Sequence, residues 1–154
     1  MPIRATMMLA DSAQAAEGKL YILGGGWNIT GPEPSPSAIA IYIEVSWDLA
    51  NMRHHWRLEL MDSDGQPVMV PTPMGEQALV LEGEVEVGRP PGVTPGTGLG
   101  VPLAINLGPL PLPPGGRYEW RLTIGGRSEE NWRLPFSTRP APAAPKEGSQ
   151  AELG

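Results

Sequence analysis

The sequence predicts an all-β protein, a sandwich of about seven to nine mostly antiparallel strands. Its 20 glycines and 19 prolines make up a quarter of the 154 residues, and both residue types break the interior of helices. Eight segments alternate apolar with polar residues, which is the period of strands that bury one face. Eight strands without a helix indicate a sandwich or a barrel, and the tyrosine spacing described below favours the sandwich.

The expected strands follow one another along residues 1–138, which we take as one domain. The first two span residues 3–10 and 19–30, with a connection of small residues between them. In residues 38–47, one face carries only apolar side chains: Ile39, Ile41, Ile43, Val45 and Trp47. Residues 55–60 alternate in the same way. The Asp62–Gly65 segment then supplies a turn, because Asp and Gly tolerate a left-handed backbone.

Four more strands complete the set, at residues 79–87, 101–107, 118–124 and 132–138. The stretch between the first two of these strands, residues 89–100, contains three prolines and is expected to be a long loop. Because Trp47, Trp56 and Trp120 fall on apolar faces, we expect all three in the core. Residues 139–154 offer too little apolar surface to offset their ordering entropy, so we expect a disordered Pro/Ala-rich tail. A docking peptide is the alternative.

Three residues before and at the start of one strand have a distinctive spacing: Leu112, Pro114 and Tyr118. This spacing resembles the tyrosine corner of fibronectin-III and immunoglobulin-like sandwiches, where a tyrosine bonds back to the preceding connection. The resemblance implies an immunoglobulin-like β-sandwich and a structural role for these residues. It carries no functional information, because one fold hosts many functions.

Composition excludes several classes of function. The chain has no cysteine, which rules out a disulfide scaffold, a thiol nucleophile and an iron–sulfur cluster. Its net charge of −6 disfavours nucleic acid and anionic membranes as partners. The apolar stretch at residues 5–10 is too short for the core of a signal peptide, so a cytoplasmic protein is expected.

The most varied polar side chains lie in residues 48–55, where we expect a contact site: Asp48, Asn51, Arg53 and His54. In an extended chain His54 and His55 point to opposite faces, so neither a metal site nor a cofactor is predicted. If this segment is catalytic, Asp48 would orient His54 as the general base of a hydrolase. Surface histidines at the start of a strand are the alternative interpretation.

Trp27 and Trp132 are not placed by the apolar pattern, and packing in the core or at its rim is the favoured interpretation. If exposed, they would anchor a protein interface or stack on a sugar ring, which defines the hypothesis of a small-molecule or carbohydrate-binding module. The leading hypothesis is a non-catalytic interaction or structural module, because the sequence offers no catalytic trio, metal set or cofactor loop. Its partner would be another protein or a second copy, forming an oligomer through a sheet edge.

Three segments of the chain have a recognisable combination of residues: Leu9–Gln14, Gly18–Trp27 and Leu60–Gly65. The first two give the pattern LADxAQ…GKLYILGGGW. The combination resembles a family of small, uncharacterised proteins from actinobacteria and their relatives, over residues 3–138. The resemblance implies no activity that could be assigned to a residue.

Overall fold

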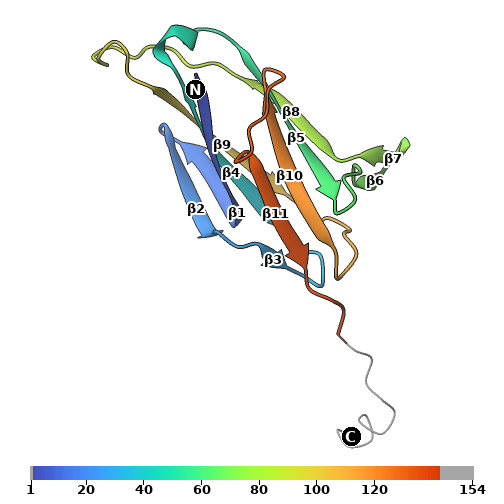
Figure 1. Cartoon of the computed structure of the whole chain (residues 1–154). Helices are drawn as coiled ribbons and strands as arrows, with labels where there is room; N and C mark the ends of the chain where they lie inside the picture. The colour runs from blue at the N-terminus through green and yellow to red at the C-terminus, as the bar shows by residue number, and fades with distance from the viewer. Residues whose placement is uncertain (1, 143–154) are drawn as a thin grey trace, which may run out of the picture.

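A computed structural model describes residues 2–142 and shows two β-sheets packed face to face (Figure 1). Within these residues the only helical element is a 3-10 turn at Trp47–Leu49. The predicted all-β sandwich is therefore confirmed. The expected tail lies outside the described residues from position 143 onward, so that expectation stays a prediction.

The first sheet has four antiparallel strands in the order β2 (Lys19–Gly25), β1 (Ile3–Ala16), β4 (Ser37–Val45) and β9 (Leu99–Leu107). The second sheet has the order β3 (Ile29–Thr30), β11 (Arg133–Thr138), β10 (Arg117–Ile124), β5 (His54–Asp62) and β8 (Val80–Val85). Only β3 and β11 pair in parallel. A separate hairpin consists of β6 (Met69–Thr72) and β7 (Gly75–Ala78).

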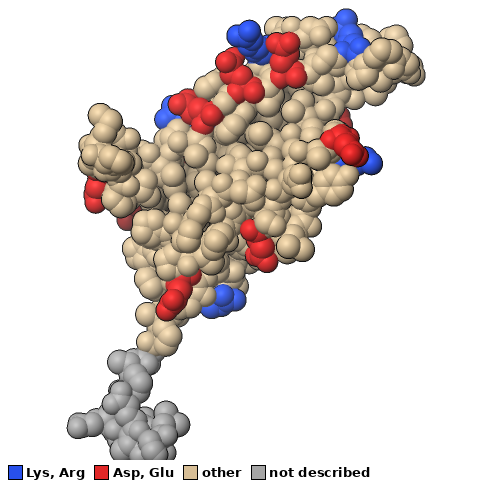
Figure 2. Space-filling view, turned by 180° about the vertical axis from the view of Figure 1, so that it is seen from behind, with Lys and Arg blue, Asp and Glu red and all other residues tan. Residues whose placement is uncertain are grey.

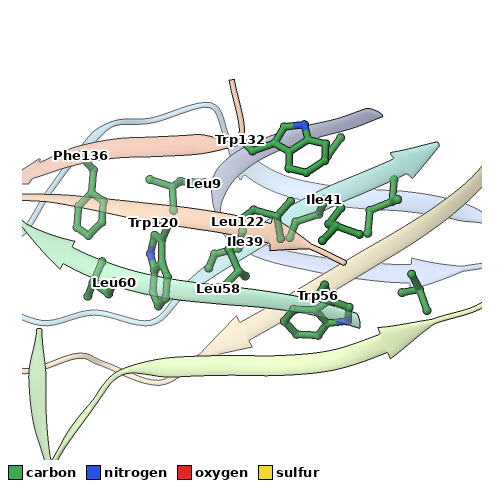
Figure 3. Packing of buried hydrophobic residues seen from close by; sticks show 14 of the residues in the cluster. Leu9, Ile39, Ile41, Trp56, Leu58, Leu60, Trp120, Leu122, Trp132 and Phe136 are labelled. Carbon is green, nitrogen blue, oxygen red and sulfur yellow. The ribbon is translucent and has the colours of Figure 1, made fainter. Parts of the chain in front are cut away.

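The core lies between the two sheets and is built from the alternating residues that the sequence indicated. Ile39, Ile41 and Ile43 on β4 are completely buried. They face large buried side chains of the other sheet, which Figure 3 shows around them: Leu58, Leu60, Trp120 and Leu122. Full burial of one such side chain stabilises the fold by about 1.5–3 kcal/mol, so this layer is the main source of stability.

Several strand limits differ from those expected. Strand β1 continues to Ala16, and the reversal comes at Glu17 and Gly18, whose φ angles are 54° and 72°. The expected strand at 19–30 is divided, because the glycine run 24–26 ends β2 and the chain then crosses to the other sheet. The β6–β7 hairpin was not predicted, since Pro71 and Pro73 interrupt the apolar alternation there. Strand β9 also begins inside the expected loop, at Leu99.

Trp47 is not a core residue, contrary to expectation. The strand ends at Val45, so the ring of Trp47 leaves the sheet and is only half-buried. The Arg89 guanidinium lies 4.8 Å from the ring centroid. Its Nε and Nη2 also donate to the Trp47 carbonyl oxygen at 3.2 and 2.7 Å. An arginine thus covers the ring in place of core side chains.

The corner before β10 has the hydrogen bond that its sequence spacing implied. The Tyr118 hydroxyl donates to the Pro113 carbonyl oxygen at 3.3 Å, in the connection that contains Leu112 and Pro114. The Thr138 hydroxyl donates to the same oxygen at 2.8 Å. Burial raises the pKa of Tyr118, and the negative charge of Asp62 raises it further.

A second, smaller cluster lies on the outer face of the first sheet. Ala38 and Ala40 alternate with the core isoleucines and therefore point outward, yet both are buried. They are covered because β1 continues past the start of β4 and returns with β2 as a two-stranded ribbon, whose Leu20 packs on these alanines. Only small side chains leave room for this ribbon.

The side chain of Asn106 on β9 fixes the ribbon in place. Its Nδ2 donates to the Ala13 carbonyl oxygen at 2.8 Å, and its Oδ1 accepts the Ala13 N–H at 3.2 Å. The carboxamide thus pairs with Ala13 as a neighbouring strand would. In Figure 1 β2 is drawn to the left of β1, at the end of the first sheet.

We predict that Tyr118→Phe lowers the free energy of unfolding by about 1 kcal/mol at neutral pH, because one hydrogen bond is lost. In the native protein, the unfolded chain loses the Tyr118 proton before the folded chain as the pH rises. Stability is therefore at its full value below about pH 10 and falls above it. Urea unfolding between pH 7 and 11 should show a weaker alkaline fall in the variant. Tyr42→Phe, at an exposed tyrosine of β4, should behave like the native protein.

We predict that Asn106→Ala lowers the free energy of unfolding by about 1–3 kcal/mol, since two partly buried backbone groups of Ala13 lose their partner. Asn106→Asp can still accept the Ala13 N–H but cannot donate to the carbonyl, so it should also destabilise. Urea unfolding measures both, with Asn131→Ala at an exposed position as control. Hydrogen exchange of the β2 amides should accelerate in both variants. Unchanged exchange would show that Asn106 does not hold the ribbon.

Candidate functional site

The polar segment expected to form a site, residues 48–55, is held by contacts within the chain. The Asp48 carboxylate accepts a hydrogen bond from the Ser46 hydroxyl at 2.7 Å, which lowers the pKa of Asp48. His54 is buried, and its Nε2 lies 3.0 Å from the Leu49 carbonyl oxygen, to which it donates. No hydrogen bond joins Asp48 to His54 among the described residues. Each of the two side chains thus has a different partner, and their role as a hydrolase pair stays a prediction.

The other polar residues of this segment contact β8 and the chain that follows it. The backbone N–H of Asn51 donates to the Val87 carbonyl oxygen at 2.7 Å, and Asn51 has a φ of 60°. Arg53 Nε lies 3.8 Å from a Glu86 carboxylate oxygen. These contacts order the segment against its neighbour.

The two unplaced tryptophans do not form an exposed platform. Trp132 is 3% exposed and belongs to the core, where it closes one end between the sheets (Figure 3). Trp27 is half-buried and packs edge-to-face on Phe136, with ring centroids 6.5 Å apart. Trp132 is therefore buried, and the alternative of an exposed ring that stacks on a sugar does not hold for this residue.

Strand β2 exposes three consecutive apolar side chains. Tyr21, Ile22 and Leu23 are 49%, 38% and 70% exposed. Ile22 points to the same side as Leu20, toward the alanine cluster, whereas Tyr21 and Leu23 point away from it. Because β2 ends the first sheet, its backbone donors and acceptors on one side have no strand partner. We define Leu20–Gly25 as the β2 edge.

The β2 edge differs from the other edge strands of the described residues. Proline and charged side chains on an edge prevent pairing with another chain. Strand β9 carries Pro102, β8 carries Glu82 and Glu84, and β3 has only two residues. The β6–β7 hairpin carries Pro71 and Glu76. The β2 edge contains neither a proline nor a charge.

Sequence reasoning placed a strand here but did not identify the β2 edge as a site. The run Tyr21-Ile22-Leu23 breaks the apolar–polar alternation, so both faces of the strand are apolar. This run has no charge and is followed by three glycines. These were the features of the sequence that could have indicated an apolar edge. What it could not reveal was that the strand lies at the end of a sheet.

Charged side chains are few on much of the surface. On the side seen in Figure 2 they lie mainly near the margins of the molecule. Among residues 2–142 there is no group of three or more acidic, histidine or cysteine side chains placed to hold a metal ion. The same part of the chain has no helix long and apolar enough to cross a membrane.

Comparison with known proteins places the chain in a family without assigning an activity. No curated protein and no solved structure matches it. A family model described as a family of unknown function, DUF6941, matches residues 5–137. This match covers most of the chain and agrees with the expected resemblance to an uncharacterised family. The chain therefore belongs to the DUF6941 family of unknown function.

Proposed function

We propose that this protein is a non-catalytic interaction module that self-associates through the β2 edge. The observation that carries the proposal is the β2 edge, Leu20–Gly25, which has exposed apolar side chains, backbone groups without a strand partner in the described residues, and neither a proline nor a charge after Lys19. Strand addition to such an edge gains main-chain hydrogen bonds and buries alternate side chains. The proposed scaffold is an immunoglobulin-like sandwich, supported by the strand order and by the Tyr118 corner.

The proposed partner is a second copy of the chain, joined by a two-fold axis. Two β2 strands would pair in antiparallel order. Each copy would then use the same set of residues, and every contact would occur twice, once in each direction. Each copy carries a net charge of −6, and like-charged surfaces repel. The β2 edge is a place where two copies can approach without bringing carboxylates together.

The ends of the ribbon add a complementary pair of charges. Lys19 is exposed at the start of β2, and the Asp11 side chain lies beside Gly24 near its end. Antiparallel pairing brings the start of one strand toward the end of the other. Lys19 of each copy would therefore approach Asp11 of the other copy, which favours self-pairing over pairing with an acidic strand.

We predict that Leu23→Lys weakens self-association, because it places a charge on the edge and removes the most exposed apolar side chain of β2. The native chain should show twice the 16.4 kDa chain mass by size-exclusion chromatography with light scattering at high concentration. The dissociation constant of the variant should rise at least about tenfold, or ~1.4 kcal/mol.

Met74→Lys is the matched control, since Met74 is an even more exposed apolar residue, at 86%, on the β6–β7 hairpin. It should dimerise as the native chain does. A native chain that stays monomeric at millimolar concentration would refute the proposal. If the two variants lose the dimer to the same extent, the effect is not specific to Leu23, and the interface does not lie at β2.

A further inference from the structure

The first half of β1 faces no other strand on one of its two sides. Strand β4 pairs with β1 from Ile3 to Ala10, whereas β2 pairs with it only from Ala10 onward. One side of β1 is therefore unpaired over residues 3–8 within the part of the chain that the structure describes. We define Ile3–Met8 as the β1 edge. Unlike the β2 edge, it carries a charged side chain, that of Arg4.

The backbone groups of two residues point outward from the β1 edge. The Leu9 carbonyl oxygen accepts the Gly26 N–H at 2.7 Å, so the backbone of Leu9 is directed away from β4. Residues of an antiparallel strand alternate between its two sides, and the pairing with β4 keeps one register along this half of β1. The N–H and C=O groups of Ala5 and Met7 therefore point the same way as those of Leu9. They have no backbone partner among residues 2–142.

A groove of about 520 Å³ lies beside the β1 edge. Residues 4–6 line it on one side, and the connection between β10 and β11 lines it on the other with Glu129 and Asn131. Trp132, which is buried in the core, also borders the groove. Its volume falls within the range of about 300–1,000 Å³ that is typical of ligand sites. The β1 edge is therefore open to a ligand and is not covered by the connection opposite.

The groove contains one carboxylate without an ion pair. The Arg4 guanidinium pairs with the Glu44 carboxylate of the neighbouring strand, so these two charges offset each other. Glu129 is half-buried and takes part in none of the ion pairs found within residues 2–142. Arg127 lines an adjoining cavity together with Glu129, and it does not line the groove itself. A cationic side chain in the groove would therefore find an ion-pair partner in Glu129.

We propose that the β1 edge binds an extended segment of a partner protein, which adds to the first sheet as a strand and carries a lysine or an arginine. Main-chain hydrogen bonds to Ala5 and Met7 hold the segment, and its cationic side chain pairs with Glu129. A second copy of the chain is a poorer fit, because a protein with a net charge of −6 is repelled by an acidic groove. The site is separate from the β2 edge and does not depend on self-association.

Hydrogen exchange with the full chain tests the strand addition directly. The probe is the end-blocked peptide Val-Thr-Val-Lys-Val-Thr-Val, in which apolar and polar residues alternate. At saturating peptide, exchange of the Ala5 and Met7 amides should slow at least about tenfold, because each amide gains an acceptor. The Thr6 amide points toward β4, so it serves as the internal reference and should not change. No slowing at Ala5 and Met7 with millimolar peptide overturns the proposal.

Two methylated forms of the peptide separate strand addition from binding through side chains alone. One form carries a methyl group on the backbone nitrogen of the lysine, and the other carries it on the backbone nitrogen of the next valine. Neighbouring N–H groups of an extended chain point to opposite sides. Only one form therefore loses a hydrogen bond to β1, and it should bind about five- to tenfold more weakly than the other. Equal binding of the two forms contradicts strand addition.

Glu129→Gln removes the carboxylate charge and keeps the size of the side chain. The lysine peptide should bind this variant about two- to fivefold more weakly, which corresponds to the loss of a partly exposed ion pair. Glu130→Gln is the matched control, because Glu130 is exposed and does not line the groove. It should bind the peptide as the native chain does. An equal effect of the two variants would show that only the overall charge matters, and Glu129 would then not be the partner of the cation.

Discussion

The packing of β4 against β5 and β10 determines where every other surface of the molecule lies. Ile39, Ile41 and Ile43 must face the second sheet, so the residues between them must face outward. Ala38 and Ala40 alternate with these isoleucines and so are two of the outward-facing residues of β4, and the β1–β2 ribbon covers them. Because the isoleucines occupy the inner face of β4, only its outer face is available to the ribbon. Strand β2 is the outer strand of that ribbon and therefore ends the first sheet.

Period-two alternation was sufficient to predict the sandwich, because each core strand buries one face against large side chains of the other sheet. It failed where burial involves small residues. Beyond Ala10, strand β1 packs through alanine, at Ala13, against a cluster of other alanines. A pattern of such small residues does not distinguish a strand from a loop. It failed again at Trp47, where the strand ended two residues before the ring.

The candidate site was harder to predict than the fold because it depends on partners far apart in the chain. The segment 48–55 is rich in polar groups, yet its backbone and side chains are engaged by residues such as Val87 and Glu86. The neighbouring Trp47 is covered by Arg89, 42 residues later. Sequence shows which groups are present and leaves open which are already paired. The β2 edge presents the opposite case, because its significance comes from having no partner strand.

The glycine run at 24–26 connects the β2 edge to Trp27 at the end of the core. A Cβ on Gly24 would displace the Asp11 side chain, and one on Gly25 would displace Ile22 and Met8. Gly24 and Gly26 also have positive φ angles, 61° and 92°, which glycine adopts without strain. These conformations end β2 and turn the chain toward the second sheet. Before the glycine run, the β2 edge has no strand partner in the described residues. After it, Trp27 packs at the core and its indole N–H is buried. Both features follow from the backbone conformation of these glycines.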